Sequence, residues 1–472
     1  MTVPHSRDAN SATSVDVVVV GAGLSGLICA DRLRQLGVGV RLLEAGERWG
    51  GRLRAHTTAS GQTVDLGGQW VGANHHHLLA LLERFGLHRY PTYYDGEGVF
   101  RWQDTNHRGP VEHDFRASLL FFKPHELGLP RAEIDDALAL QQTFQALTDQ
   151  VPSRAPWQTS EAEVLDRTTV AAWLDQQGAT ALARYPFSWF TRVGGSGGYE
   201  PHESSLLHLA WSQAAAPQHE TPEAWLIEGG AFQVADSLAR QLGDAVQLRA
   251  PVSAIEQGNT GVRVLVGDGS WLNAAAAVVA IPPPLRMGIH FSPPLPPAWT
   301  GLLQRSPMGS MVKVLAIYPT PFWRGQELNG HGVGLLPTLE ATVDSSPPNG
   351  PWVLAGFIAG ARAVAWQQLD ERARRRAVLS DLEAWWGPQA GHPQELICHN
   401  WNEESWSTGA FTSFVSPGAW TTYGPIWQSP HGRVFWAGTE ASSRWPGYCE
   451  GALEAGLAAA DQVQQLLGRG SR

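Results

Sequence analysis

Residues 15–26 read VDVVVVGAGLSG and decide the fold of this chain. The first six of them are apolar except for one aspartate, as expected of a buried parallel strand. Leucine and alanine then recur at helical spacing from Leu24 to Leu36, and a second apolar run covers residues 38–43. This strand, helix, strand unit has the size of a dinucleotide-binding crossover. We therefore predict an α/β protein built on a parallel sheet.

Three glycines in this stretch, Gly21, Gly23 and Gly26, have the spacing that phosphate binding requires. The first permits a tight turn, the second lets the backbone approach a pyrophosphate, and the third lets helix and strand pack closely. Phosphates would then lie at the positive end of the helix. Glu44, at the end of the second strand, is placed to accept hydrogen bonds from ribose hydroxyls. Because the chain has 51 glycines, the flanking strands and helix carry this prediction more than the glycines do.

Two glycine pairs follow, in ERWGGR at residues 47–52 and DLGGQW at residues 65–70. Arg52 ends the first segment and offers a bidentate contact to phosphate. A nicotinamide enzyme does not need this further wrapping, so the segments favour a longer buried cofactor. The alternative is an ordinary loop with a surface arginine.

Together these segments make the chain resemble the flavin monoamine oxidase family, which also includes polyamine oxidases, L-amino-acid oxidases and histone lysine demethylases. The resemblance spans nearly the whole chain. It implies a Rossmann-type FAD-binding domain of discontinuous segments with a mixed α+β substrate domain, the amine oxidase fold. The motifs that carry it are GAGLSG, ERWGGR, DLGGQW, PFWR at 321–324, WAGTE at 436–440 and RWPGYCEGA at 444–452. The implied FAD-binding domain comprises 12–80, 224–288 and 400–468, and the implied substrate-binding domain comprises 81–223 and 289–399.

The resemblance also implies which residues touch each part of FAD. Ser25 and Arg52 would contact the phosphates, and Glu44 the adenosine ribose. Val252 would contact the adenine through its backbone, and Glu440 the ribitol region. The other cofactor-binding residues that the resemblance implies are Gly21, Gly23, Leu24, Gly26, Gly67, Gly68, Gln69, Trp70, Trp401, Gly438, Thr439, Tyr448 and Cys449.

Three aromatic residues carry the implied catalytic site. Trp401 would lie against the isoalloxazine ring, and Phe411 and Tyr448 would flank the flavin face as the family's amine cage. Aromatic faces steer and polarise an amine nitrogen because their quadrupole favours electron-poor partners. Core packing is the alternative for each ring.

Departures from the family pattern matter at three positions. Ala410 stands where membrane monoamine oxidases carry the cysteine that bonds the flavin, so FAD should be held without a covalent link. Phe411 replaces a tyrosine. Gly288 is aligned with the family's lysine that holds a water near the flavin N5, and of the two lysines, Lys123 and Lys313, the latter is matched to a different position. No substitute lysine is therefore expected near the flavin.

The implied reaction is hydride transfer from the carbon next to a neutral amine to the flavin N5. Water then hydrolyses the imine to an aldehyde or keto acid, and oxygen is reduced to hydrogen peroxide. A primary monoamine is the first choice, because the aromatic-rich pocket favours an apolar substrate.

Other reactions stay open. An L-amino-acid oxidase needs an arginine for the carboxylate, and Arg192 is a candidate. A polyamine oxidase would use carboxylates such as Glu200 and Glu203. The glycine at 288 keeps open an FAD-dependent amine dehydrogenase that uses another acceptor. A flavin-binding module without turnover is the alternative outside enzymology.

Charge and cysteine usage restrict the setting of the chain. A net charge of −10 argues against nucleic-acid binding, which needs a concentrated basic surface. Three cysteines without a CxxC pair fit a reducing compartment, and neither terminus carries the apolar stretch of a signal peptide or membrane anchor. We expect a cytoplasmic enzyme whose partners are a small-molecule amine and oxygen, and a homodimer is one assembly open to it.

Two patterns are given little weight as sites. His75, His76 and His77 are consecutive and cannot all face one ion, so no metal is predicted. Residues 194–198 fit the GxSxG hydrolase pattern but lie between helical segments, so we interpret them as a flexible joint. The 21 tryptophans are interpreted mainly as core filling.

Further along the chain, helices are predicted at 137–147 and 170–182. Strands are predicted at 246–250, 261–266, 276–281 and 434–437. A last helix is predicted from about residue 451 to residue 467.

Overall fold

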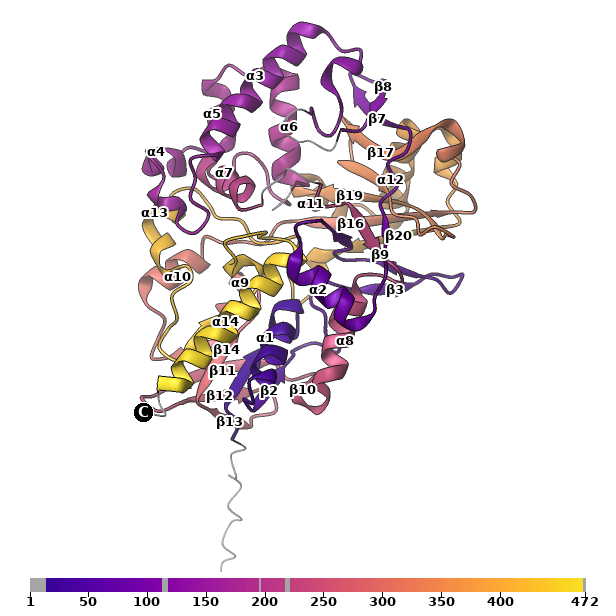
Figure 1. The fold of residues 1–472 in the computed structure, drawn as a ribbon. Coiled ribbons are helices and arrows are strands. Elements are labelled where there is room, and N and C mark those ends of the chain that lie inside the picture. The colour runs from indigo at the N-terminus through magenta and orange to yellow at the C-terminus, as the bar shows by residue number, and fades with distance from the viewer. Residues whose placement is uncertain (1–13, 113–117, 195–196, 217–220, 470–472) are drawn as a thin grey trace, which may run out of the picture.

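The computed structural model describes residues 14–112, 118–194, 197–216 and 221–469. A five-stranded sheet forms the centre of the lower half of the molecule in Figure 1, and every neighbouring pair of its strands is parallel. Its strands, in spatial order, are β10 (Val246–Gln247), β2 (Val40–Leu43), β1 (Val17–Val20), β14 (Ala276–Val279) and β21 (Val434–Trp436). The predicted parallel sheet is confirmed.

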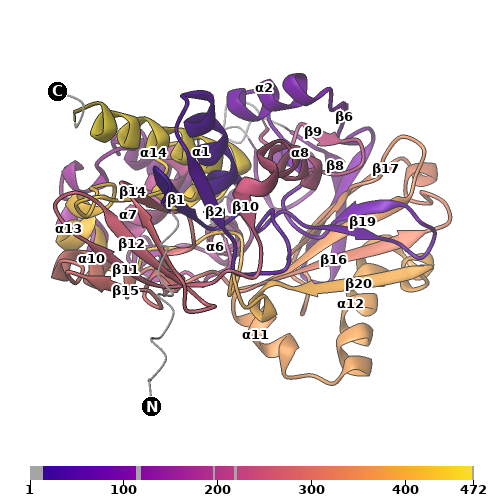
Figure 2. The same cartoon turned by 90° about the horizontal axis from the view of Figure 1, so that it is seen from below.

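The valines of β1 show why this sheet lies between two layers. Val17 and Val19 pack with helices α1 (Leu24–Gln35), α8 (Phe232–Leu242) and α14 (Cys449–Arg469). Val18 and Val20 point the other way and pack with a small four-stranded sheet. Successive side chains of a strand alternate between faces, so a run of four valines is buried on both. Figure 2 shows the helices on one side of β1 and β2 and the small sheet on the other.

The small sheet is mixed. Its strands, in order, are β13 (Trp271–Ala274), β12 (Val262–Val266), β11 (Val252–Gln257) and β15 (His290–Ser292). Helices α9 (Pro283–Arg286) and α10 (Pro297–Leu303) flank β15 in the chain.

A seven-stranded sheet and a group of helices make up the upper half in Figure 1. The strands, in order, are β20 (Glu395–Asn400), β16 (Met311–Tyr318), β19 (Trp352–Ala359), β18 (Ala341–Asp344), β17 (Leu328–Gly334), β7 (Glu97–Trp102) and β8 (Thr105–Pro110). The helices beside it are α3 (Arg131–Thr148), α4 (Ala162–Arg167), α5 (Val170–Gln176), α6 (Ala181–Arg192), α7 (Leu206–Ala215), α11 (Gly360–Gln367) and α12 (Glu371–Trp386). The division of the chain into two domains at the residues given above stays a prediction.

Short elements complete the fold. They are the paired strands β3 (Ala55–Thr57) and β4 (Thr63–Asp65), the three-stranded sheet of β5 (Trp70–Val71), β9 (Trp225–Ile227) and β6 (Arg89–Pro91), and helices α2 (His76–Phe85) and α13 (Ala419–Tyr423).

One predicted helix is wrong. Residues 170–182 do not form one helix, because α5 ends at Gln176 and α6 begins at Ala181. Gly178 adopts φ +62° between them, and the Thr180 hydroxyl accepts a hydrogen bond from Ala183 N–H to start α6. The apolar period runs across the break because both helices bury the same kind of face.

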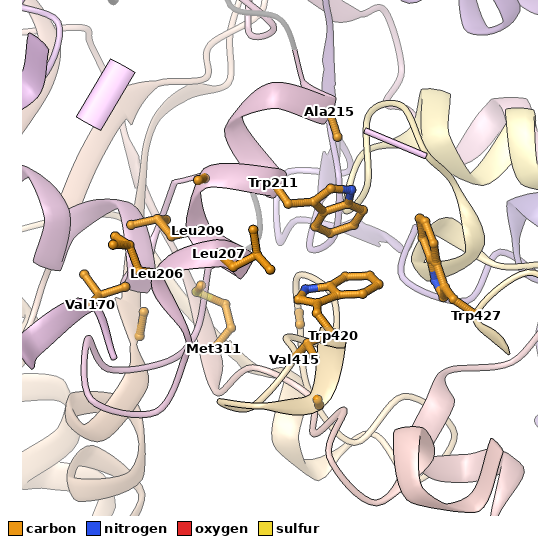
Figure 3. Packing of buried hydrophobic residues seen from close by; sticks show 14 of the residues in the cluster. Val170, Leu206, Leu207, Leu209, Trp211, Ala215, Met311, Val415, Trp420 and Trp427 are labelled. Atoms are coloured by element: carbon orange, nitrogen blue, oxygen red, sulfur yellow. The ribbon is translucent and has the colours of Figure 1, made fainter. Parts of the chain in front are cut away.

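Tryptophans fill the core, as interpreted from the sequence. Trp211, Trp420 and Trp427 pack against one another with ring centroids 5.0 to 5.4 Å apart (Figure 3). Of the helices within the described ranges, none is long and apolar enough to cross a membrane.

Candidate active site

A cavity of about 980 Å³ lies at the carboxyl ends of the five-stranded sheet. Its wall contains the residues at or just after the ends of four parallel strands: Val20, Glu44, Ala280 and Gly438. Open parallel sheets bind ligands at this edge. The volume matches a site for a large cofactor.

The glycine segments bring backbone against backbone around this cavity. A Cβ on Gly26 would lie 1.9 Å from the Gly21 carbonyl oxygen, and one on Gly67 would lie 2.0 Å from the Arg52 carbonyl oxygen. Gly50 N–H donates to the Ala22 carbonyl at 2.8 Å, which joins the second segment to the first. A side chain at Gly26 or Gly67 would collide with these carbonyl oxygens, so glycine is required at both positions.

The start of α1 has the features of a phosphate site. Its N-cap residue, Gly23, has no side chain to cap the helix, so the first N–H groups have no side-chain partner there. The Ser25 hydroxyl accepts a hydrogen bond from Gly438 N–H at 2.8 Å and keeps its own proton to donate. Both features fit the pyrophosphate of FAD.

Glu44 also lines the cavity. Its two carboxylate oxygens each accept one backbone N–H, from Ala22 and from Gly46, both at 2.8 Å. These bonds fix the carboxylate and leave lone pairs for ribose hydroxyls.

Arg52 lines the cavity and forms a bidentate pair with Glu440 from the other end of the chain, at 2.6 and 3.1 Å. Arg52 also donates to the Phe411 carbonyl at 2.7 Å, and Glu440 accepts the Thr412 hydroxyl at 3.0 Å. The Glu440 carboxylate is therefore held by protein groups behind the wall. The same arginine joins the phosphate region to the peptide of Phe411.

The three implied catalytic rings, Trp401, Phe411 and Tyr448, all line this cavity. Trp401 is fixed by a hydrogen bond from its indole nitrogen to the Leu66 carbonyl at 3.0 Å. Phe411 packs edge-on against Phe357, with ring centroids 5.7 Å apart. Tyr448 packs edge-on against Trp445 at 5.3 Å. Phe411 and Tyr448 thus each have an aromatic support on one side and the cavity on another.

One of the two lysines lies in the cavity wall, although no substitute for Gly288 was expected. Lys313 lines the same cavity as the three rings, as does Gly288. The lysine is 2 % exposed, and its ammonium donates to the Gly67 carbonyl at 2.8 Å and to the Gln69 side chain. Burial lowers its pKa to about 7, while the charge of Asp65 acts in the opposite direction. Lys313 reaches the cavity from β16, 25 residues after Gly288.

Lys313 was therefore the functional residue that sequence reasoning passed over. A signal for it was present, because it is the one charge in MVKVLAIY, a strand whose side chains are otherwise apolar or aromatic. A lysine buried in such a strand needs a polar partner, and lysines almost never remain buried without one.

Most predicted cofactor residues lie in the cavity wall, and four do not. Gly26 lies beneath the turn, Gln69 holds Lys313 and Ser345, and Trp70 lies under the Lys313 ammonium. Glu440 is the fourth. The predicted residues in the wall are Gly21, Gly23, Leu24, Ser25, Glu44, Arg52, Gly67, Gly68, Val252, Trp401, Phe411, Gly438, Thr439, Tyr448 and Cys449.

The residues considered for binding an amino acid or a polyamine already have partners within the protein. The Arg192 guanidinium pairs with the Glu200 carboxylate at 2.8 Å, and Glu200 N–H donates to Glu203 at 2.7 Å. Arg192 is therefore not free to hold a substrate carboxylate. The two glutamates are likewise committed to partners within the protein.

The remaining patterns lie elsewhere. His75 is fully buried against Tyr448 and Trp445, whereas His76 and His77 begin α2. Within the part of the chain that the structure describes, no group of three histidine, cysteine or acidic side chains could hold a metal. Ser196 of the GxSxG pattern lies outside the described residues.

Comparison with known proteins agrees with this geometry. Residues 24–464 match the model of the family described as flavin containing amine oxidoreductase. An L-amino acid dehydrogenase of Synechocystis sp. is 38 % identical over 97 % of this chain and 96 % of its own length. Amine oxidase [flavin-containing] A of Sus scrofa is 32 % identical over 98 % of this chain and 87 % of its own.

Among solved structures, cyclohexylamine oxidase from Brevibacterium oxydans is 30 % identical with a TM-score of 0.89, covering 96 % of this chain and 99 % of its own. The fold is therefore the amine oxidase fold. The glycine-lined cavity, the aromatic rings in its wall and the family match lead to one conclusion. The chain belongs to the flavin-containing amine oxidoreductase family, and it is an FAD-dependent enzyme acting on CH–NH groups.

Proposed function

We propose that this enzyme oxidises a primary monoamine to an imine, which water hydrolyses to an aldehyde, and that oxygen is reduced to hydrogen peroxide. The observation that carries the proposal is the sharing of one cavity wall by Phe411, Tyr448 and Lys313 with the glycine segments. FAD, when bound, accepts the hydride from the carbon next to the amine. Phe411 and Tyr448 orient the amine nitrogen and exclude water from it.

Residues from both ends of the chain would hold the cofactor. The start of α1 and Ser25 would hold its pyrophosphate, Glu44 its adenosine ribose and Trp401 its ring system. Lys313 would hold a water molecule and place a positive charge beside the flavin.

A second candidate is an amine or L-amino-acid dehydrogenase that uses another electron acceptor. The relative from Synechocystis, named an L-amino acid dehydrogenase, favours it. Two observations count against this second candidate. The Arg192 guanidinium is held by Glu200, and the Lys313 ammonium is present in the cavity wall. We propose the oxidase on these grounds.

The test is to reduce the bound flavin anaerobically with primary monoamines, L-amino acids and polyamines, and then to admit oxygen. Rapid bleaching by a monoamine followed by rapid reoxidation with peroxide release is expected. Bleaching only by an amino acid, or slow reoxidation, would favour the dehydrogenase. No bleaching by any of the three classes would leave a flavin-binding module.

The amine cage makes its own prediction. Tyr448→Ala should lower kcat/KM for a primary monoamine about tenfold, because one aromatic face is worth about 1 to 2 kcal/mol to an amine nitrogen. Tyr448→Phe keeps the ring and is expected to stay within about threefold of the wild type. Steady-state peroxide release, with the flavin spectrum checked in each variant, measures both. Equal losses in the two variants would show that the hydroxyl matters and the ring does not.

Attachment of the flavin is also predicted. Ala410 precedes Phe411 in the cavity wall and has no nucleophilic atom to bond a flavin. Acid precipitation of the purified enzyme should therefore leave all yellow colour in the supernatant. Colour that stays with the pellet after washing would contradict non-covalent binding.

The proposed setting is the cytoplasm, supported by free Cys29, Cys398 and Cys449. A homodimer also stays a prediction, which light scattering of the purified enzyme would test.

A further inference from the structure

Arg286 is a buried arginine for which the amine chemistry has no use. It ends the short helix α9 and is 3 % exposed. Its Nε donates to the Ile281 carbonyl at 3.0 Å, and one terminal nitrogen donates to the Ala437 carbonyl at 2.9 Å. Ile281 follows β14 and Ala437 follows β21, so the guanidinium joins the carboxyl ends of two neighbouring strands beside the cofactor cavity.

The charge of Arg286 has no carboxylate in contact. Both hydrogen-bond partners are neutral carbonyls, and none of the ion pairs among the described residues includes Arg286. Burial lowers the pKa of Arg286 to about 10, so it stays protonated at neutral pH. The guanidinium also lies over the Trp436 ring, 5.2 Å from its centroid, but a buried charge without a carboxylate partner is still costly. The contacts of Arg286 therefore do not explain why a positive charge is buried at this place.

The surrounding charges sum to one positive. Arg52 and Glu440 form a close pair and cancel each other. The Glu440 and Arg286 charges act on each other through space, and Arg52 and Arg286 repel. Two guanidiniums and one carboxylate thus leave a net positive charge in this corner of the protein.

Gly438 separates this charge from the cavity. A Cβ on Gly438 would lie 3.7 Å from a terminal nitrogen of Arg286 and 3.3 Å from the Glu440 carboxylate. Gly438 itself lines the cavity, and its N–H donates to Ser25 in the first turn of α1. The unpaired charge therefore lies directly behind the part of the wall where the phosphates of the cofactor belong.

We propose that Arg286 is the buried counter-charge for the pyrophosphate of FAD, acting through the Gly438 wall without touching the cofactor. The pyrophosphate carries negative charge that the Arg52–Glu440 pair, being neutral as a unit, does not offset. In a low-dielectric interior a charge one residue away still acts strongly. Arg286 is thus a positioning residue and an electrostatic one, because it also holds the ends of β14 and β21 together.

The experiment titrates the full-length apoprotein with FAD, and separately with ADP, which has a pyrophosphate and no flavin. The variants are Arg286→Gln, which keeps hydrogen-bond donors without the charge, and Arg286→Lys, which keeps the charge. Arg433→Gln is the matched control. Arg433 is partly exposed at the opposite end of β21, and it also donates to backbone carbonyls, of Asn259 and Ala275.

Arg286→Gln is expected to weaken FAD and ADP by the same factor, at least about tenfold, and the loss should persist at high salt because a buried charge is screened little. Arg286→Lys should stay within about threefold of the wild type, and Arg433→Gln within about twofold. Circular dichroism of each apoprotein establishes that it is folded. If Arg286→Gln does not fold, the lysine variant decides, because a folded Arg286→Lys that has lost about tenfold or more in affinity for FAD and ADP would show that charge is not what matters.

Three results would overturn the proposal. They are a folded lysine variant that binds as weakly as the glutamine variant, a loss for FAD without a loss for ADP, and an unchanged affinity in Arg286→Gln. A shift in the midpoint potential of the bound flavin with unchanged affinity would place the action of Arg286 on the ring instead of the pyrophosphate. None of these results depends on which amine the enzyme oxidises.

Discussion

Lys313→Met is expected to slow reoxidation of the reduced flavin by oxygen about a hundredfold, and to leave anaerobic reduction by amine within a few-fold. The Lys313 ammonium is buried in the cavity wall and held by the Gly67 carbonyl and the Gln69 side chain. A fixed positive charge in a dry site stabilises the negative charge that develops on oxygen as it accepts electrons. Methionine keeps an unbranched side chain of similar length and removes the ammonium, with its charge and its two hydrogen bonds.

Stopped-flow absorbance separates the two half-reactions. Lys123→Met is the matched control, because Lys123 is the other lysine of the chain and its side chain is 48 % exposed. That variant should reoxidise at the wild-type rate. If Lys313→Met also did so, the ammonium would have a structural role only.

The pH dependence follows from the same ammonium. Burial lowers the pKa of Lys313 to about 7, so its positive form is present below that pH and lost above it. Wild-type reoxidation should therefore slow as the pH rises through about 7, and Lys313→Met should show no such step. Asp65 faces this lysine, and burial raises the pKa of Asp65 to about 6, so its own ionisation falls just below this range.

Arg52→Met is expected to destabilise the apoprotein by about 3 to 5 kcal/mol and to abolish FAD retention. The Glu440 side chain is 5 % exposed and would keep the Thr412 hydroxyl and the charge of Arg286, which acts on it without an ion-pair contact. Burial alone would raise the pKa of Glu440, but the charge and hydrogen bonds of Arg52 outweigh burial and hold it below its usual value. Without Arg52 the carboxylate is buried with no cation in ion-pair contact.

Urea unfolding of the apoprotein measures this loss. The wild-type pair contributes stability above pH 4.5, and that stability is lost as the pH falls through the lowered pKa of Glu440. In Arg52→Met, protonation of Glu440 should relieve the penalty, so the difference from the wild type should shrink in acid.

Two further variants test whether the buried charge causes this loss of stability. Adding Glu440→Gln should recover much of the loss, because it removes the unpaired charge. Arg54→Met is the control, since Arg54 is 35 % exposed and pairs with the 23 % exposed Glu404, and it should cost less than about 1 kcal/mol. A loss in Arg54→Met as large as that in Arg52→Met would show that burial of the pair is not the cause.

The sequence predicted best where one local pattern determines one local structure. The GAGLSG stretch required a turn, a bare helix start and a close approach of backbone, and Gly21, Gly23 and Ser25 lie in the cavity wall as a result. It predicted least well where a side chain arrives from another element. Lys313 enters from β16 of the large sheet, and only the folded arrangement brings it to Gly67.

A second difference lies within one motif. Gly67 and Gly68 line the cavity, whereas Gln69 and Trp70 belong to the same motif and lie behind it, under Lys313. A motif identifies a segment, and only the folded path of the backbone decides which of its residues face the cavity.

The contact between Ser25 and Gly438 also governs when this enzyme can acquire its cofactor. The two residues are 413 positions apart, and the wall is completed by Tyr448 and Ala452, close to the end of the chain. A nascent chain that has not yet reached Gly438 has the Ser25 side of the cavity wall and lacks the opposite side. Flavin loading therefore requires that the chain be synthesised at least as far as these residues.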